Sequence, residues 1–324
     1  MRIGAALGML AGLALAGWLL SRFGVGAVLA LIGHAGWTGV LAVVAFHLVQ
    51  VVFSGIAWRV IAGPTVPRPG PWAFVVLRWI REGVNNLLPV AQIGGSFVAA
   101  RLLQKRGVAL APAIAGTIAD LTVEVTTQIA FTALGLGLLV HGVGGGGVSR
   151  TVAGGIAVAV LVAAAFLGAQ WLGLANVLER GVMRLGRSMG WRGTGRVEGL
   201  HEALIACYRS PRRVMLAAAS QMASWLLGGI EVCLALHVLG HDVGLVPGLV
   251  IESLGQALKA AAFAAPGALG VQEGGYIVIC RLFGLSPEVA LALSLMKRLR
   301  EVLLGVPGLL AWQLMEGRGR APAR

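Results

Sequence analysis

The stretch Arg78-Trp-Ile-Arg81-Glu82-Gly-Val-Asn85-Asn86-Leu-Leu-Pro89-Val-Ala-Gln92-Ile-Gly94-Gly95 places charged and amide side chains inside an otherwise apolar chain. Another polar stretch begins at Gln256-Ala-Leu-Lys259 and resumes as Pro266-Gly-Ala-Leu-Gly270-Val-Gln272-Glu273-Gly274-Gly275. Irregular backbone at membrane depth is tolerated only where protein or a wet cavity satisfies its polar groups. Interrupted segments at corresponding places in two halves of a chain point to a transporter's binding site. The two stretches therefore predict a polar site inside a membrane protein.

The composition of the whole chain agrees with a membrane location. Of the 324 residues, 57% are hydrophobic and only 12% are charged, against about 25% charged residues in ordinary soluble domains. The net charge is +13, but the basic residues gather between apolar runs, which is typical of cytoplasmic loops rather than of a nucleic-acid-binding surface. We therefore predict an all-α, polytopic integral membrane protein with no nucleic-acid partner.

Several apolar runs are long enough to cross a bilayer, which takes about 20 helical residues. They lie near 3–20, 38–62, 109–140, 151–171, 214–240, 245–264 and 286–314, with a shorter apolar piece at 271–283. The prediction is a single membrane domain, 1–324, with about 7–8 transmembrane helices. Its halves, about 1–140 and 151–316, would form an inverted repeat, each with one broken or re-entrant segment, 78–97 and 262–276. Whether 262–283 is a re-entrant hairpin or two short crossings stays open.

Loop charges set the expected orientation. Lys and Arg residues concentrate in 63–108, in 172–213, which contains eight arginines, and in the C-terminal tail. By contrast, 141–150 contains one arginine and 241–244 contains no Lys or Arg. Because positively charged loops stay in the cytoplasm, we expect a multi-pass protein of the bacterial plasma (inner) membrane with both termini cytoplasmic. The 172–213 segment is expected to be a cytoplasmic helix pair on the membrane surface.

Polar residues also form stripes inside the predicted spans. A charge in the hydrocarbon costs about 2.5–3.5 kcal/mol on insertion scales, so each needs a reason. Four sets share a helical face by their spacing: Thr117, Asp120, Glu124, Thr127 and Gln128; Gln221, Ser224, Gly228 and Glu231; Glu252, Gln256 and Lys259; and Lys297, Arg300 and Glu301. Each stripe alone could be a set of interhelical hydrogen bonds. Four stripes beside two broken segments favour one shared polar cavity.

The sequence gives little support for a metal site or for nucleophilic catalysis. Cys207, Cys233 and Cys280 form no CxxC pair, and so indicate neither a disulfide framework nor a metal site. His237 and His241 stand four residues apart without the further ligands of a zinc site. No nucleophile and base are recognisable as a pair. We expect neither a metal nor a cofactor.

The broken segments also carry a family resemblance. The pattern Arg81-x3-Asn85-Asn86-Leu-Leu-Pro89-x4-Gly94-Gly95-x5-Arg101, followed by Asp120, resembles the membrane region of lysylphosphatidylglycerol synthase-type proteins, and the second half fits with Pro266-Gly-x2-Gly270-x2-Glu273. The tail, from Ala262 to Gly308, is most similar to the hopanoid-associated branch of that family, HpnL. The resemblance implies a flippase-like lipid module with re-entrant segments.

Two departures from the family pattern bear on the substrate. Two-domain relatives carry a soluble aminoacyl-transferase domain after the membrane region, whereas this sequence stops at Arg324, so lysyl transfer is not expected. Ser96 stands where many relatives have an acid. This difference favours an anionic or neutral lipid headgroup over a cationic one.

The expected function is transfer of a membrane lipid, with its headgroup in the central cavity and its tail in the bilayer. The expected substrate-binding residues are Arg78, Arg81, Asn85, Asn86, Gln92, Gly94, Gly95, Arg101, Asp120, Glu124, Glu252, Lys259, Gln272, Glu273, Lys297 and Arg300. Among them, Arg78, Arg81 and Arg101 would attract the headgroup, and the glycines would let backbone approach it closely.

Two alternatives remain from the sequence. The first is an integral membrane enzyme of isoprenoid or lipid biosynthesis that uses Asp120 or Glu124. The second is a non-catalytic partner that binds lipid-biosynthesis enzymes through 172–213.

Overall fold

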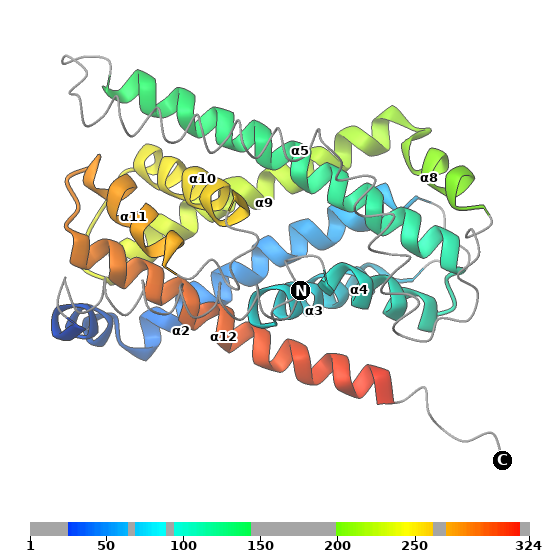
Figure 1. Ribbon diagram of the computed structural model, residues 1–324, viewed down its shortest axis with the longest axis horizontal. Helices are drawn as coiled ribbons and strands as arrows, with labels where there is room; N and C mark the ends of the chain where they lie inside the picture. Colours follow the sequence, from blue (N-terminus) through cyan, green and yellow to red (C-terminus); the bar gives the residue numbers. More distant parts are fainter. Residues whose placement is uncertain (1–24, 64–68, 89–93, 144–198, 262–269, 318–324) are drawn as a thin grey trace.

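A computed structural model describes residues 25–63, 69–88, 94–143, 199–261 and 270–317. Within these ranges the chain contains helices and connecting turns, and no strand (Figure 1). The helices are α2 (Val25–Ile61), α3 (Pro71–Leu87), α4 (Gly94–Lys105), α5 (Leu110–Val143), α8 (Leu200–Tyr208), α9 (Pro211–Val238), α10 (Leu245–Ala261), α11 (Val271–Arg281) and α12 (Pro287–Gly317). The all-α prediction is confirmed.

Prolines and glycines set the ends of the helices in the first broken segment. Pro71 opens α3 directly after Gly70, a position where the missing N–H of proline costs nothing. The helix ends at Leu87 because Leu88, which precedes Pro89, is extended, with φ −104° and ψ 146°; a residue before proline is pushed out of the helical region. The helix therefore ends inside the predicted broken segment, 78–97.

Three of the described helices are long and apolar enough to cross a membrane: Gly33–Ile61 of α2, Leu110–His141 of α5 and Pro211–Val238 of α9. The shortest of them has 28 residues and is about 42 Å long at 1.5 Å per residue, which exceeds the roughly 30 Å of hydrocarbon. They match the predicted runs 38–62, 109–140 and 214–240. The protein is therefore an all-α membrane protein.

The other predicted spans divide into two groups. The runs 245–264 and 286–314 correspond to α10 and α12, whose charged stripes keep them from being uniformly apolar. The runs 3–20 and 151–171 lie outside the described residues. The number of 7–8 transmembrane helices stays a prediction.

Helix α2 begins earlier in the chain than the predicted apolar run, 38–62. It starts at Val25 and contains a kink at Gly36, where φ is 60° and ψ is 176°. A positive φ of this kind is accessible mainly to glycine, so the chain bends here and then continues as helix.

The helix order of 25–143 recurs in 211–317. In each part a long helix is followed by a helix of 17 residues, a short one of 12 or 11 residues, and a long one of 34 or 31 residues. The first long helices, α2 and α9, pack side by side and run antiparallel, since Gly39 approaches Val238 while Ser54 contacts Ser224 (Figure 1). Likewise α3 packs on α12, and α10 packs on α5.

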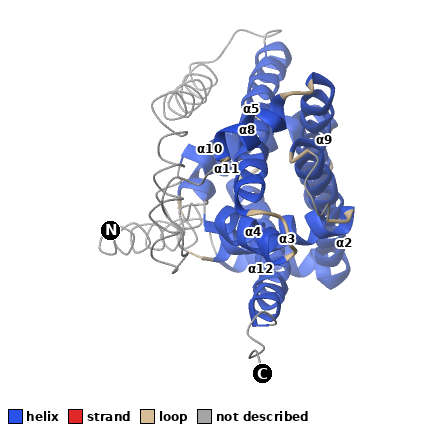
Figure 2. Ribbon diagram, turned by 90° about the vertical axis from the view of Figure 1, so that its right-hand side faces the viewer, coloured by secondary structure: helices blue, strands red, loops and turns tan. Residues whose placement is uncertain are grey.

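The molecule has a layered arrangement in which α2 and α9 stand beside the remaining helices (Figure 2). Part of the predicted 172–213 loop is helical: α8 occupies 200–208 and α9 begins at 211. Rather than lying free on a surface, α8 packs on α5 and buries Cys207. Residues 172–198 lie outside the described part of the chain.

Two hydrophobic clusters fill opposite ends of the molecule. One surrounds Trp58, Phe74 and Leu102, and joins α3 and α4 to the end of α2 and the start of α5. The other surrounds Leu236 and Tyr276, and joins α10, α11 and the start of α12 to the end of α9. Each long helix passes from one cluster to the other. A polar region lies between them.

Candidate functional site

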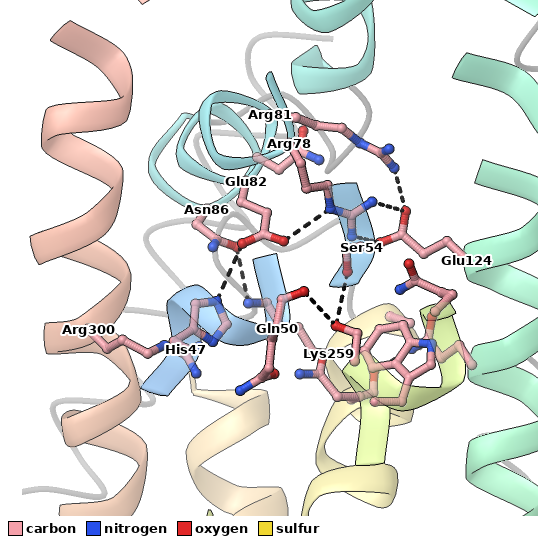
Figure 3. Close-up of a pocket in the computed structure, with 17 residues that line it drawn as sticks. His47, Gln50, Ser54, Arg78, Arg81, Glu82, Asn86, Glu124, Lys259 and Arg300 are labelled. Carbon is pink, nitrogen blue, oxygen red and sulfur yellow. Dashed lines mark hydrogen bonds and ion pairs between the residues drawn. The ribbon is translucent and has the colours of Figure 1, made fainter. Parts of the chain in front are cut away.

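A polar cavity of about 160 Å³ lies between the two hydrophobic clusters. Six helices contribute to it, and almost every lining side chain is charged or carries an amide or hydroxyl group (Figure 3). The lining residues are His47, Gln50, Ser54, Arg78, Arg81, Glu82, Asn85, Asn86, Glu124, Gln128, Gln221, Ser224, Trp225, Gln256, Lys259, Ala260 and Arg300. This volume can hold several waters, but is smaller than the roughly 300–1,000 Å³ typical of sites for drug-sized ligands.

The cavity lies midway along the three candidate membrane spans. The lining residues of α2 are 47–54 within the span 33–61, and those of α5 are 124–128 within 110–141. On α9 they are 221–225 within 211–238. The polar site therefore lies near the middle of the membrane thickness that these helices would cross. Its polar groups would otherwise have to be buried in hydrocarbon at high cost.

Arg78 and Arg81 bind carboxylates across the interior. Both come from α3 and are almost fully buried. Arg78 Nη2 lies 2.6 Å from Glu124 Oε1, and Arg81 Nη1 lies 2.5 Å from Asp120 Oδ2. Arg78 also reaches Glu82 Oε1, one turn along the same helix, at 3.1 Å (Figure 3). These arginines are thus held in place by carboxylates of α5.

A second cluster centres on Glu231 of α9. His47 Nδ1 lies 2.8 Å from Glu231 Oε2, and Gln50 and Arg300 both donate hydrogen bonds to the same carboxylate. The other nitrogen of the imidazole, Nε2, lies 3.4 Å from Glu82 Oε2. His47 therefore bridges a carboxylate of α9 and a carboxylate of α3.

A third cluster joins α10 to α12. Lys259 Nζ lies 2.6 Å from Glu301 Oε1 and 3.2 Å from Asn86 Oδ1. Deeper inside, Lys297 pairs with Glu252, which also accepts a hydrogen bond from Gln256 Nε2 at 2.8 Å. These contacts connect both broken segments, since Asn86 precedes the first break and Lys259 the second.

The structure brings several predicted site residues to the cavity wall. Seven line it: Arg78, Arg81, Asn85, Asn86, Glu124, Lys259 and Arg300. Asp120, Glu252 and Lys297 lie one layer behind and bind lining residues or each other. Gln92 lies outside the described residues.

Other predicted site residues lie away from the cavity. Arg101 is part of a partly exposed pair, 2.6 Å from Glu316 at the end of α12, and does not line the cavity. Glu273 accepts the backbone N–H of Gly270 at 2.6 Å and pairs with Arg298 at 2.8 Å. It thereby caps α11 rather than lining the cavity, and the neighbouring Gln272 is buried outside it as well.

Gly95 and Gly275 lie at close contacts between helices. A Cβ on Gly95 would lie 2.2 Å from the backbone oxygen of Arg81, and a Cβ on Gly275 would lie 1.8 Å from the Leu258 side chain. Each glycine lets the short helix after a break lie against the helix before it. Gly94, next to Gly95, does not line the cavity either.

Sequence reasoning missed the α2 side of the cavity. His47, Gln50 and Ser54 follow the same three- and four-residue spacing that identified the other stripes, so the signal was present in the predicted span 38–62. Glu82 was also missed. Gln128, Gln221, Ser224 and Gln256 were placed on stripes but not in the site.

The acid–base groups of the cavity all have ion-pair partners. Glu82 and Glu124 are each bound to an arginine, and His47 lies between Glu82 and Glu231. No cluster of three His, Cys, Asp or Glu side chains with metal-binding geometry occurs in the ranges that the structure describes. The geometry thus offers hydrogen bonds and balanced charge in a membrane-embedded pocket.

Comparison with known proteins agrees with this picture. A family model described as the lysylphosphatidylglycerol synthase TM region matches residues 3–308. No match was found among curated proteins or among solved structures. The matched region contains the complete cavity.

Proposed function

The chain belongs to the family of the lysylphosphatidylglycerol synthase transmembrane region, and we propose that it moves a lipid between the leaflets of the membrane. The lipid headgroup occupies the cavity while the acyl or terpenoid tail stays in the bilayer. Passage through a polar interior lowers the cost of taking a headgroup across hydrocarbon.

One observation carries this proposal: the polar cavity lies midway along three helices that can span a membrane. Transporters place substrate sites near the bilayer midplane, at the contact between two structurally repeated halves. The recurrence of the α2–α5 helix order in α9–α12, with α2 and α9 antiparallel, supports such an inverted repeat.

The outer surface supports a lipid tail outside the cavity. Helix α12 exposes Val302, Val306, Leu310 and Leu314, which recur every four residues and form one apolar stripe. An uninterrupted apolar surface of this kind faces lipid in a membrane protein. The tail can therefore remain in contact with the bilayer.

The proposed location is the plasma (inner) membrane, with the basic end of the molecule in the cytoplasm. Arg78 and Arg81 are buried and do not count as loop charges. The remaining basic residues still concentrate at the end formed by α4, α8 and the start of α9: Arg59, Arg101, Lys105, Arg106, Arg209, Arg212 and Arg213. Because Glu316 at the end of α12 pairs with Arg101 and Lys105, this distribution supports a cytoplasmic C-terminus. The N-terminal residues 1–24 lie outside the described part of the chain, and a cytoplasmic N-terminus is proposed from the loop charges of the sequence alone.

From the family and from the resemblance to its HpnL branch, we propose a phospholipid or a hopanoid as the substrate. We propose transport rather than catalysis because the candidate catalytic carboxylates of the sequence, Asp120 and Glu124, are bound to Arg78 and Arg81. A partner role through 172–213 would leave the paired charges and amides of the central cavity without a purpose.

A reconstitution assay tests the proposal. The protein is placed in liposomes that contain a lipid with a fluorescent tail, and a membrane-impermeant reductant bleaches only the outer leaflet. The protein should raise the bleached fraction above the half reached in empty liposomes. Ser224→Trp, which fills the cavity, should remove this increase.

The matched control is Leu310→Trp, which adds a similar side chain on the exposed α12 surface, where Leu310 is 56% exposed. It should transport as the natural protein does. Full transport by folded Ser224→Trp would refute a route through the cavity.

A further inference from the structure

We infer that the cavity recognises a neutral, polyhydroxylated group, such as a sugar or polyol, rather than a phosphate. This inference rests on the proposed lipid-handling function and narrows its substrates, because a phospholipid would bring a phosphate into the cavity. Three features carry it: paired cations, a lining rich in neutral polar groups, and a buried acceptor that lacks a donor.

The cations that line the cavity already have carboxylate partners. Arg78 and Arg81 bind Asp120 and Glu124 on α5. The other two belong to pairs at the opposite wall: Lys259 binds Glu301, and Arg300 binds Glu231. A phosphate could gain one of these cations only by displacing its carboxylate, which would leave a buried negative charge uncompensated.

The charge count around the cavity gives the same result. The four lining cations are matched by five carboxylates, of Glu82, Asp120, Glu124, Glu231 and Glu301. The sum is one negative charge when His47 is neutral, and zero when His47 is protonated. No positive excess remains within this set to attract an anion, so electrostatics favour an uncharged ligand.

The remaining polar lining is neutral. It consists of Gln50, Ser54, Asn85, Asn86, Gln128, Gln221, Ser224 and Gln256. Carboxamides both donate and accept hydrogen bonds, and so do hydroxyl groups. A ligand with several hydroxyls therefore matches this wall in both directions, whereas phosphate oxygens can only accept from it.

Two buried polar atoms of lining residues lack a partner, the donor Nε of Arg300 and the acceptor Oε1 of Gln221, and a hydroxyl group can both donate and accept. Gln221 is 1% exposed, and its Oε1 has no hydrogen-bond partner among the described residues. Leaving a buried acceptor without a donor is destabilising. A hydroxyl group can satisfy it, and an ionised phosphate cannot.

Trp225 adds an oriented aromatic ring to the wall. Its Nε1 donates to Thr127 Oγ1 at 3.1 Å, and its ring stacks on Phe131 with 6.2 Å between centroids. These two contacts fix the indole, and Trp225 lines the cavity, so its apolar area can cover the C–H groups of a sugar or polyol. Amides beside an aromatic ring complete a site for an uncharged polar ligand.

A native mass spectrometry competition tests the inference. The full chain, in an amine-oxide detergent that contains no sugar, is mixed with equal amounts of monoglucosyl diacylglycerol, phosphatidylglycerol and phosphatidic acid of the same acyl chains. Retention should follow that order, and the glucosyl lipid should exceed phosphatidic acid about tenfold, a difference of about 1.4 kcal/mol. Equal or stronger retention of phosphatidic acid would overturn the inference.

Two variants locate the site. Gln221→Leu should lower retention of the glucosyl lipid about tenfold without affecting phosphatidic acid. Gln272→Leu is the matched control, because Gln272 is also buried with an unpartnered Oε1 but lies outside the cavity. Equal losses in both variants, or no loss in Gln221→Leu, would also overturn the inference.

A further measurement, with methyl glucoside in place of the glucosyl lipid, distinguishes a free sugar from a lipid headgroup as the ligand. If methyl glucoside alone binds as tightly as the glucosyl lipid, the ligand chemistry holds but a free sugar is its source, against the proposed lipid transport. If only the lipid binds, both proposals stand. If phosphatidic acid is retained and also transported in liposomes, the function stands and the headgroup inference fails.

Discussion

At the residue scale, the buried ion pairs between α3 and α5 connect the first broken segment to a long helix. Arg81 is 2% exposed and Asp120 is fully buried, and the two lie 2.5 Å apart. Burying charges is costly even when they are paired, but removing one partner costs more because the other charge remains. The pair therefore restricts α3 to one position against α5.

Replacing Asp120 with Asn should lower the free energy of unfolding by about 3–5 kcal/mol, since Arg81 then loses one of its two carboxylates inside the protein. The double variant Arg81→Met/Asp120→Asn should recover much of this loss. Thermal unfolding in detergent measures both. A single variant as stable as the natural protein, or a double variant worse than the single, would contradict the ion-pair account.

Arg101 provides the contrasting case. Its side chain is 29% exposed and pairs with Glu316, which is 31% exposed. Exposed pairs of this kind contribute about 0–1 kcal/mol. Arg101→Ala should therefore change stability by less than about 1 kcal/mol and leave lipid transport intact in liposomes. A transport loss as large as that of a cavity variant would show that Arg101 takes part in lipid binding.

The sequence predicted which polar residues share a helix face better than it predicted their partners, for a physical reason. Three- and four-residue spacing shows which polar side chains share a helical face, so the stripes around Asp120, Gln221 and Lys297 were predictable. Spacing does not show which face of one helix meets which face of another. For that reason only the three-dimensional structure shows that Arg81 pairs with Asp120. The same holds for the position of Arg101 at the surface.

At the scale of helices, each break is followed by a glycine that lets two helices touch. The ends of α3 and α10 were predictable from Pro89 and from the Pro266–Gly270 stretch. The role of the glycines was not, because a glycine that approaches a ligand and one that approaches a helix look the same in sequence. The structure assigns Gly95 and Gly275 to helix contact.

Gly95→Ala should destabilise the α3–α4 pair by about 1–3 kcal/mol, because the new Cβ would overlap the backbone oxygen of Arg81. Gly274→Ala is the matched control, since nothing lies within 4 Å of a Cβ at that position. Hydrogen exchange of α4 and thermal unfolding would report the difference. Equal stability of the two variants would show that α4 does not pack as described.

At the scale of the whole molecule, the recurrence of α2–α5 in α9–α12 suggests how access to the cavity could alternate. The two parts meet along α2 and α9, which are antiparallel, and the cavity lies at their contact. A relative rocking of the halves would open the cavity first to one side and then to the other. The sequence predicted two halves from their broken segments, but the α2–α9 contact was not predictable from spacing.

A reversible cross-link tests this motion. A Cβ on Gly39 would lie 3.1 Å from Cβ of Val238, slightly closer than the roughly 3.5–4.5 Å between the Cβ atoms of a disulfide, so a small separation of the helices would allow the bond. Gly39→Cys/Val238→Cys, in a chain whose Cys207, Cys233 and Cys280 are replaced by Ala, should transport lipid only under reducing conditions. Full transport in the oxidised, cross-linked protein would contradict a rocking of the halves at this contact.

The most direct measurement is to locate the headgroup during transfer. A lipid with a photoactivatable diazirine in its headgroup is illuminated in liposomes that contain the protein, and the adducts are mapped by mass spectrometry. A passage through the cavity predicts adducts on 47–54 and 221–225, which disappear in Ser224→Trp. Adducts confined to the exposed α12 surface, 302–314, and unchanged by Ser224→Trp would contradict it.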